Sequence, residues 1–106
     1  MNSDFMTSRT AANLMRAFAG ESQARNRYTF AADKAKNSNL YVIEAVFKFT
    51  ADQEKEHAEI FYNHLSSLAG ETIHIDGGYP VDPGDTVIQL LRSAQHNEYE
   101  EWQDAY

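Results

Sequence analysis

The chain has 106 residues, enough for one small domain, and its 42% hydrophobic and 24% charged residues are typical of a folded globular protein. The formal net charge of −7 argues against binding to nucleic acid or to anionic membranes, since both attract basic surfaces. With no cysteine, the sequence excludes disulfides, iron–sulfur clusters and thiolate metal sites, so any metal would be held by oxygen and nitrogen ligands.

The N-terminal part of the chain predicts a first helix over residues 10–36. Residues 1–9 contain no apolar run that resembles a secretory signal, and no segment approaches the roughly 20 apolar residues of a membrane span. A cytoplasmic location without membrane contact is therefore expected. Ser8 or Thr10 can cap the helix, and one helix face is marked by residues at spacings of three and four. These residues are Leu14, Phe18, Glu21, Arg25, Tyr28 and Ala32.

A second helix is predicted over residues 40–68, antiparallel to the first. Asn37, Ser38 and Asn39 favour a turn because their side chains bond readily to the local backbone, and so short a link makes neighbouring helices antiparallel. Gly70 is suited to the position after the helix C-terminus. The second helix has its own stripe, in which His64 is interpreted as a partly buried core or rim residue. The stripe consists of Ile43, Val46, Phe47, Thr50, Glu54, His57, Phe61, His64 and Leu65.

Residues 70–84 are predicted to form a long crossover that leads to a third helix over residues 85–106. Glycines and prolines prevent a regular helix in this segment, and its length is sufficient to cross from one end of a bundle to the other. The apolar pattern of the third helix runs on to Tyr106 without a stop signal, which predicts either a fragment or an end covered by a partner. Residues on or near one face of this helix are Val87, Ile88, Leu90, Leu91, Ala94, Glu98 and Glu101.

Carboxylates on the apolar stripes indicate a cation site. Glu54 and His57, three residues apart, project from one face of the second helix, and Glu21 lies on the stripe of the first. Burying an unpaired carboxylate costs several kcal/mol, so it normally happens only with a partner or a metal. Glu98 and Glu101 would add two carboxylates from the third helix.

The order of these residues matches a known kind of metal centre. Di-iron and di-manganese bundles take one Glu from each of two helices and a Glu-x-x-His from each of the other two. Oxygen ligands with a few imidazoles suit iron or manganese, and zinc is a possible substitute. Each feature taken alone also has a purely structural interpretation. A Glu-x-x-His pair is common on solvent-exposed helices, and the residues from Glu98 to Glu101 could form a solvent-exposed charged face. Tyr28 could simply pack in the core.

Three segments resemble the helix motifs of the rubrerythrin family. They are Glu21-Ser-Gln-Ala-Arg-Asn-Arg-Tyr28, Ala51-Asp-Gln-Glu-Lys-Glu-His-Ala58 and Glu98-Tyr-Glu-Glu-Trp102 followed by Tyr106, and the Gly84-Asp-Thr86 start of the third helix also matches. The resemblance implies an all-α, ferritin-like four-helix bundle, of which residues 1–106 supply helices one, two and at least the start of three as a partial di-iron domain. It also implies a non-haem di-iron protein that reduces hydrogen peroxide to water in oxidative-stress defence.

The resemblance further implies a role for each ligand. Glu54 would bridge two irons, with Glu21 a terminal ligand of the first iron and Glu98 of the second. The first iron would exchange His57 for Glu101 between the reduced and oxidised states, and Tyr28 would hydrogen-bond Glu101. His57, Glu101 and Tyr28 are thus the expected catalytic residues.

Two parts of the family pattern do not occur in this sequence. One is the fourth helix with a second Glu-x-x-His, so a further helix or chain carrying that motif is expected as a partner, either a C-terminal remainder or a swapped subunit of a homo-oligomer. The other is the cysteine-rich rubredoxin domain, so a separate rubredoxin-like electron donor is expected. Two alternatives to the peroxidase remain open: a ferritin-like ferroxidase or storage module, and a non-catalytic helical interaction fragment.

Overall fold

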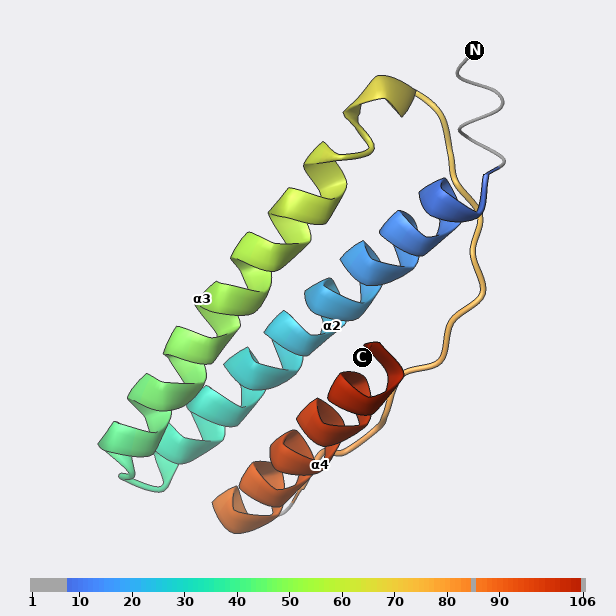
Figure 1. Ribbon diagram of the computed structural model, residues 1–106. Coiled ribbons are helices and arrows are strands. Elements are labelled where there is room, and N and C mark those ends of the chain that lie inside the picture. Colours follow the sequence, from blue (N-terminus) through green and yellow to red (C-terminus); the bar gives the residue numbers. More distant parts are fainter. Residues whose placement is uncertain (1–7, 85, 106) are drawn as a thin grey trace.

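The computed structural model describes the backbone of residues 8–84 and 86–105, and side chains as far as residue 97, apart from residue 85. Over this range the fold is all-α, without a strand, as expected for a ferritin-like bundle (Figure 1). Its elements are α2 (Arg9–Asn37), α3 (Tyr41–Asn63), the short 3₁₀ helix η1 (Ser66–Leu68) and α4 (Val87–Ala105).

α2 is the central helix. It packs along its length against α3 in an antiparallel hairpin, and α4 lies on its other side (Figure 1). The described part of the chain is elongated, 53 × 23 × 20 Å. α4 runs antiparallel to α2 (Figure 1).

Both ends of α2 are defined by local hydrogen bonds. The Ser8 hydroxyl accepts a hydrogen bond from the amide of Ala11 at 3.1 Å, so of the two candidate caps Ser8 is the one used. At the other end Asn39 adopts a left-handed φ of 60°, and the Leu40 amide donates to the Ala35 carbonyl at 2.9 Å. This is a Schellman turn, which confirms the turn expected at residues 37–39.

α3 is shorter than expected: it ends at Asn63 rather than continuing to Leu68. The amide of Leu65 bonds to the carbonyl of Tyr62, three residues back, which tightens the chain into a turn before η1. Gly70, with φ 88°, therefore follows η1 and not the α-helix. His64 caps α3 and is exposed, so its interpretation as a core or rim residue was wrong.

The crossover of residues 70–84 runs the length of the hairpin and is tied to α2 at two points (Figure 1). Arg16 donates to the carbonyl of Asp76 near one end, and Lys34 donates to the carbonyl of Gly84 near the other. α4 then starts with a reciprocal cap, because the hydroxyl of Thr86 accepts from the amide of Gln89 and the amide of Thr86 donates to the side chain of Gln89.

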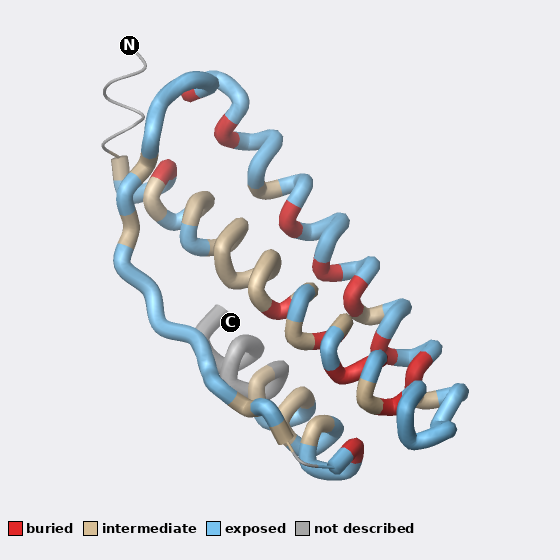
Figure 2. The backbone as a smooth tube through the Cα atoms, turned by 180° about the vertical axis from the view of Figure 1, so that it is seen from behind, coloured by how far each residue is buried: buried red, intermediate tan, exposed pale blue. Residues whose placement is uncertain are grey.

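The core consists of two apolar clusters built mainly from small residues (Figure 2). The larger joins α2, α3 and the first turns of α4, and the smaller lies where η1 meets the start of α2. Alanines along α2 let the helices approach closely. The larger cluster is Ala24, Tyr28, Ala31, Ala32, Ala35, Phe47, Ala51 and Val87, and the smaller is Ala11, Leu65 and Leu68.

Besides His57 and His64, three apolar residues of the predicted stripes face outward. Val46 is 54% exposed on α3, and Ile88 and Leu91 are exposed on α4. The buried line of α3 instead includes Glu44, which is only 9% exposed. The stripe of α3 is thus narrower than the spacing of its apolar residues indicated.

Candidate metal centre

The hairpin brings together one ligand atom each from Glu21, Glu54 and His57. These three atoms all lie within 4.8 Å of one another, and Glu21 Oε2 is 3.5 Å from Nδ1 of His57. Glu21 comes from α2 and the other two residues come from α3, one turn apart. The two helices therefore place the predicted carboxylates and imidazole at one point, between the two apolar clusters.

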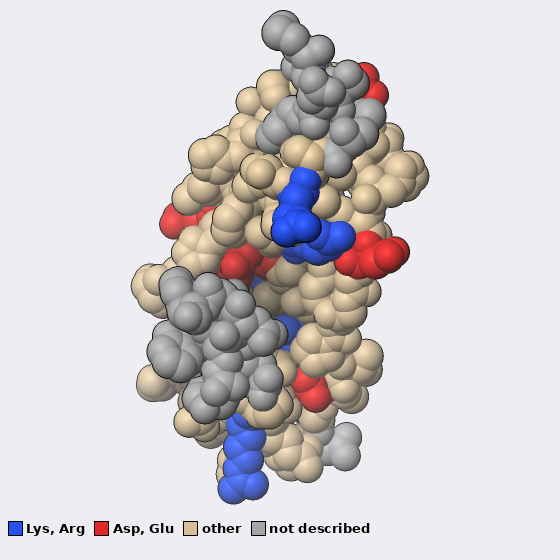
Figure 3. Space-filling model, turned by 45° about the vertical axis from the view of Figure 1, so that its right-hand side comes forward, with Lys and Arg blue, Asp and Glu red and all other residues tan. Residues whose placement is uncertain are grey.

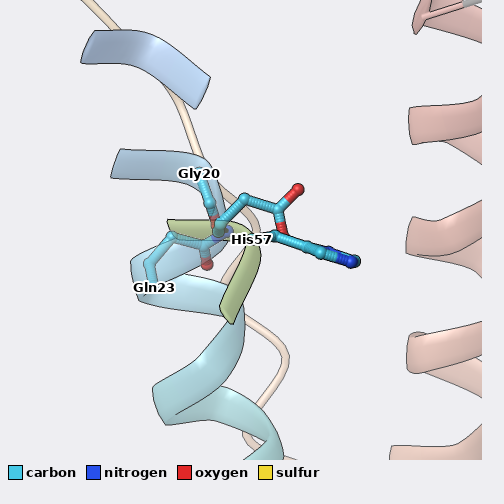
Figure 4. A network of polar contacts seen from close by, with 4 residues as sticks. Gly20, Gln23 and His57 are labelled. Carbon is cyan, nitrogen blue, oxygen red and sulfur yellow. Dashed lines mark hydrogen bonds and ion pairs between the residues drawn. The ribbon is translucent and has the colours of Figure 1, made fainter. Parts of the chain in front are cut away.

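The cluster is buried on one side and open on the other. Glu54 is 8% exposed, and the side chain of Glu21 is 14% exposed with its Oε2 atom shut off from water. The side chain of His57, in contrast, is 55% exposed. In Figure 4 the ring of His57 extends from the hairpin toward α4. Figure 3 shows the surface hollowed near the middle of the molecule, with acidic and basic side chains together inside the hollow.

Side-chain contacts within α2, and one ring contact between α2 and α3, surround this part of the hairpin. The side-chain amide of Gln23 donates to the carbonyl of Gly20 at 2.8 Å, and its oxygen accepts from Nε of Arg27 at 2.7 Å (Figure 4 shows Gly20 and Gln23 beside His57). On the other side of Glu21, the rings of Phe18 and Tyr62 pack at 4.7 Å between centroids. The three candidate ligands thus project from helices and not from a loop.

The donor set fits iron. Two carboxylates and one imidazole, with no sulfur, suit iron or manganese better than copper. A buried carboxylate pair is costly without a cation, and Glu21 and Glu54 form such a pair next to an imidazole. A metal ion would be held by these three side chains and would keep the open side toward α4 for further ligands.

Two predicted ligands lie outside the described side chains. Glu98 and Glu101 fall within the backbone of α4, which runs opposite the open side of the cluster. Their side chains are not described, and they remain predictions. Tyr28 is buried, with its ring 6.2 Å from that of Phe47. Its predicted hydrogen bond to Glu101 also lies outside the described residues.

Glu44 is a buried carboxylate that the sequence reasoning missed. It pairs with Lys48 at 2.9 Å, and its hydrogen bond and negative charge raise the pKa of Lys48. The i, i+4 spacing of the two residues was a signal for this pair. Ten residues separate Glu44 from Glu54, about 15 Å along the helix, so Glu44 belongs to a different turn from the candidate centre.

The helical frame and its inward carboxylates define the class of protein: a ferritin-like helical domain with a carboxylate–histidine cluster between its helices. The family model "Rubrerythrin" matches residues 12–106. The chain belongs to the rubrerythrin family.

Curated relatives agree with this assignment. Rubrerythrin-1 of Clostridium acetobutylicum is 48% identical over 100 residues, which cover 92% of this chain and 51% of that protein. Rubrerythrin of Porphyromonas gingivalis is 44% identical over 106 residues, covering 100% of this chain and 52% of the relative. Rubrerythrin of Nitratidesulfovibrio vulgaris is 42% identical over 97 residues, covering 89% and 49%. The chain therefore spans about half the length of the curated relatives it matches.

No solved structure matches the chain significantly. Within the described residues, no helix is long and apolar enough to span a lipid bilayer.

Proposed function

We propose that this chain supplies part of a di-iron centre that reduces hydrogen peroxide to water. The observation that carries the proposal is the convergence of ligand atoms of Glu21, Glu54 and His57 within 4.8 Å of one another, with Glu54 buried and His57 exposed. Membership of the rubrerythrin family supports iron as the metal. Two irons, when bound, would supply together the two electrons that reduction of one peroxide requires.

The unequal burial of the three side chains suits a centre in which one ligand changes. Glu21 and Glu54 are held in the core, where their carboxylates cannot swing away without leaving a cavity. His57 is on the open side, so its imidazole can approach or leave a metal by a rotamer change alone. This supports the exchange of His57 for Glu101 between redox states, with Glu101 arriving from α4.

Completion of the centre requires more ligands than the described cluster offers. Even with Glu98 and Glu101, the five candidates give two irons only one imidazole, and we propose that a second Glu-x-x-His comes from another helix or chain. An outward apolar row on α3 supports assembly into an oligomer. This row is Val42, Val46, Phe49 and Ile60, between 54% and 79% exposed. A rubredoxin-like protein is the proposed electron donor.

Metal loading tests the proposal directly. The assembled protein is loaded with ferrous iron without oxygen, desalted and analysed for iron. Glu54→Ala should lose most of the bound iron, while Glu56→Ala, an exposed neighbour on the same helix, should bind as much as the parent. Equal iron in Glu54→Ala and in the parent would place the site elsewhere.

The described ligands also serve a second candidate, a ferritin-like ferroxidase or storage module, since Glu21, Glu54 and His57 suit either use. The two functions differ in the fate of the iron after its oxidation. Stoichiometric peroxide consumption with a supplied reductant supports the peroxidase, whereas growth of a ferric mineral beyond two irons per site supports storage. A purely structural helical module is disfavoured because Glu54 is only 8% exposed beside a second carboxylate.

A further inference from the structure

Arg25 is a partly buried cation one helical turn from Glu21 of the candidate metal centre. On α2 it follows Glu21 by four residues and precedes Tyr28 by three, so all three share the inner face. Arg25 is half-buried, and its Nε atom is shut off from water without an acceptor among the residues that the structure describes. Leaving a buried donor unpaired is costly, which suggests that Arg25 is kept there for its charge.

The usual direction of long side chains on a helix predicts that this charge lies near the carboxylates. Long side chains on a helix lean toward its N-terminus and cover the preceding turn, which for Arg25 is the turn that carries Glu21. Glu21 in turn has a ligand atom within 4.8 Å of one on Glu54.

We propose that Arg25 is the built-in counter-charge of the metal-free centre. Before metal arrives, two buried carboxylates face each other, and the guanidinium reduces their repulsion so that the hairpin keeps them in position. When metal arrives it takes over this neutralising role, and Arg25 then repels the incoming cation. Arg25 is thus a positioning residue that lowers metal affinity while it stabilises the empty site. This inference rests on the proposed metal centre.

A counter-charge and a packing residue differ in how their loss changes the stability of the metal-free protein and its affinity for metal. Arg25→Gln should make the metal-free protein unfold at lower denaturant concentration and yet bind Co²⁺ more tightly, on the order of threefold to tenfold at low salt. The gain in affinity should shrink as added salt screens the charges. Arg25→Lys, which keeps the charge, should bind Co²⁺ like the parent.

The measurements use the full chain in its assembled form, with Co²⁺ binding followed by its visible absorption and unfolding followed by helix signal in chelator. Arg9→Gln is the matched control, because it removes the same charge from an exposed position about 18 Å along α2 from Glu21. Arg9→Gln should change neither affinity nor stability. Weaker Co²⁺ binding in Arg25→Gln, or values equal to those of Arg9→Gln, would overturn the counter-charge role.

A second arm does not depend on metal. In chelator, Arg25→Gln should lower the stability of the parent more than it lowers the stability of the Glu21→Gln variant. The Glu21→Gln variant has already lost the carboxylate charge that Arg25 offsets. Equal losses in both backgrounds would refute the inference even if metal binds as proposed. If the parent binds no Co²⁺ and no Fe²⁺, the proposed function fails, and this arm still decides whether Arg25 offsets Glu21.

Discussion

Because Glu21 and Glu54 lie close together, we predict that the charge of Glu54 destabilises the protein when no metal is bound. Ligand atoms of Glu21 and Glu54 lie no more than 4.8 Å apart, and two unit charges at that distance repel by about 3.5 kcal/mol at an effective dielectric constant of about 20. Water on the His57 side and nearby positive charge reduce this figure. Glu54→Gln, which keeps the shape and removes the charge, should therefore stabilise the metal-free protein by about 1–2 kcal/mol.

The assay is denaturant unfolding in chelator and again with excess ferrous iron under anaerobic conditions. In chelator the midpoint of Glu54→Gln should exceed that of the parent, while Glu56→Gln, exposed on the same helix, should leave it unchanged. With ferrous iron the order should reverse, because iron stabilises only a protein that binds it, by RT ln(1 + [Fe]/Kd).

A lower midpoint for Glu54→Gln in chelator would refute the reasoning. It would mean that hydrogen bonds to Glu54 outweigh its repulsion with Glu21, and that this carboxylate is a structural residue. The same result would remove the main physical argument for a cation between α2 and α3.

Three further predictions concern the crossover, the redox states and the assembly. Gly84→Ala should lower the free energy of unfolding by about 1–2 kcal/mol, because Gly84 has a φ of 59° and a Cβ there would lie 2.8 Å from the Leu90 side chain. Gly78→Ala is the control and should change this free energy little, because nothing lies within 4 Å of a Cβ at that position. Thermal unfolding of both variants and the parent measures the difference. Crystals of the assembled protein in reduced and oxidised states should differ in one iron position near His57 and Glu101, and identical positions would favour storage. Sedimentation should give a species heavier than 12.0 kDa, and a well-folded monomer with a bound di-iron centre would contradict the need for a partner.

The hairpin and the convergence of Glu21, Glu54 and His57 could be predicted because strong local signals coincide. Asn39 and its neighbours indicate a turn in any helical context, and Glu21, Glu54 and His57 interrupt stripes that would otherwise be apolar. Ser8 was one of two equivalent caps, and only the observed hydrogen bond to Ala11 separates them.

The features that could not be predicted depend on contacts between segments. The end of α3 at Asn63 results from packing of Leu65 and Leu68 against Ala11, which turns the chain before the spacing pattern stops. Burial of Glu44 depends on the approach of α2, and an i, i+4 partner on a helix more often marks a solvated face. Val46 belongs by type to a core, yet its angle around α3 points it outward.

The turn at residues 37–40 has a consequence for how the centre is made. Glu21 and Glu54 lie at similar distances from it, about 20–25 Å along their helices, so closing the turn in register is sufficient to bring the first three candidate ligands together. Contacts between consecutive helices are local in sequence and form quickly, whereas ordering the long crossover comes at a higher entropic cost. We therefore expect an early folding intermediate, or a growing chain that has exposed little more than its first 60 residues, to capture a metal ion before the rest of the bundle assembles around it.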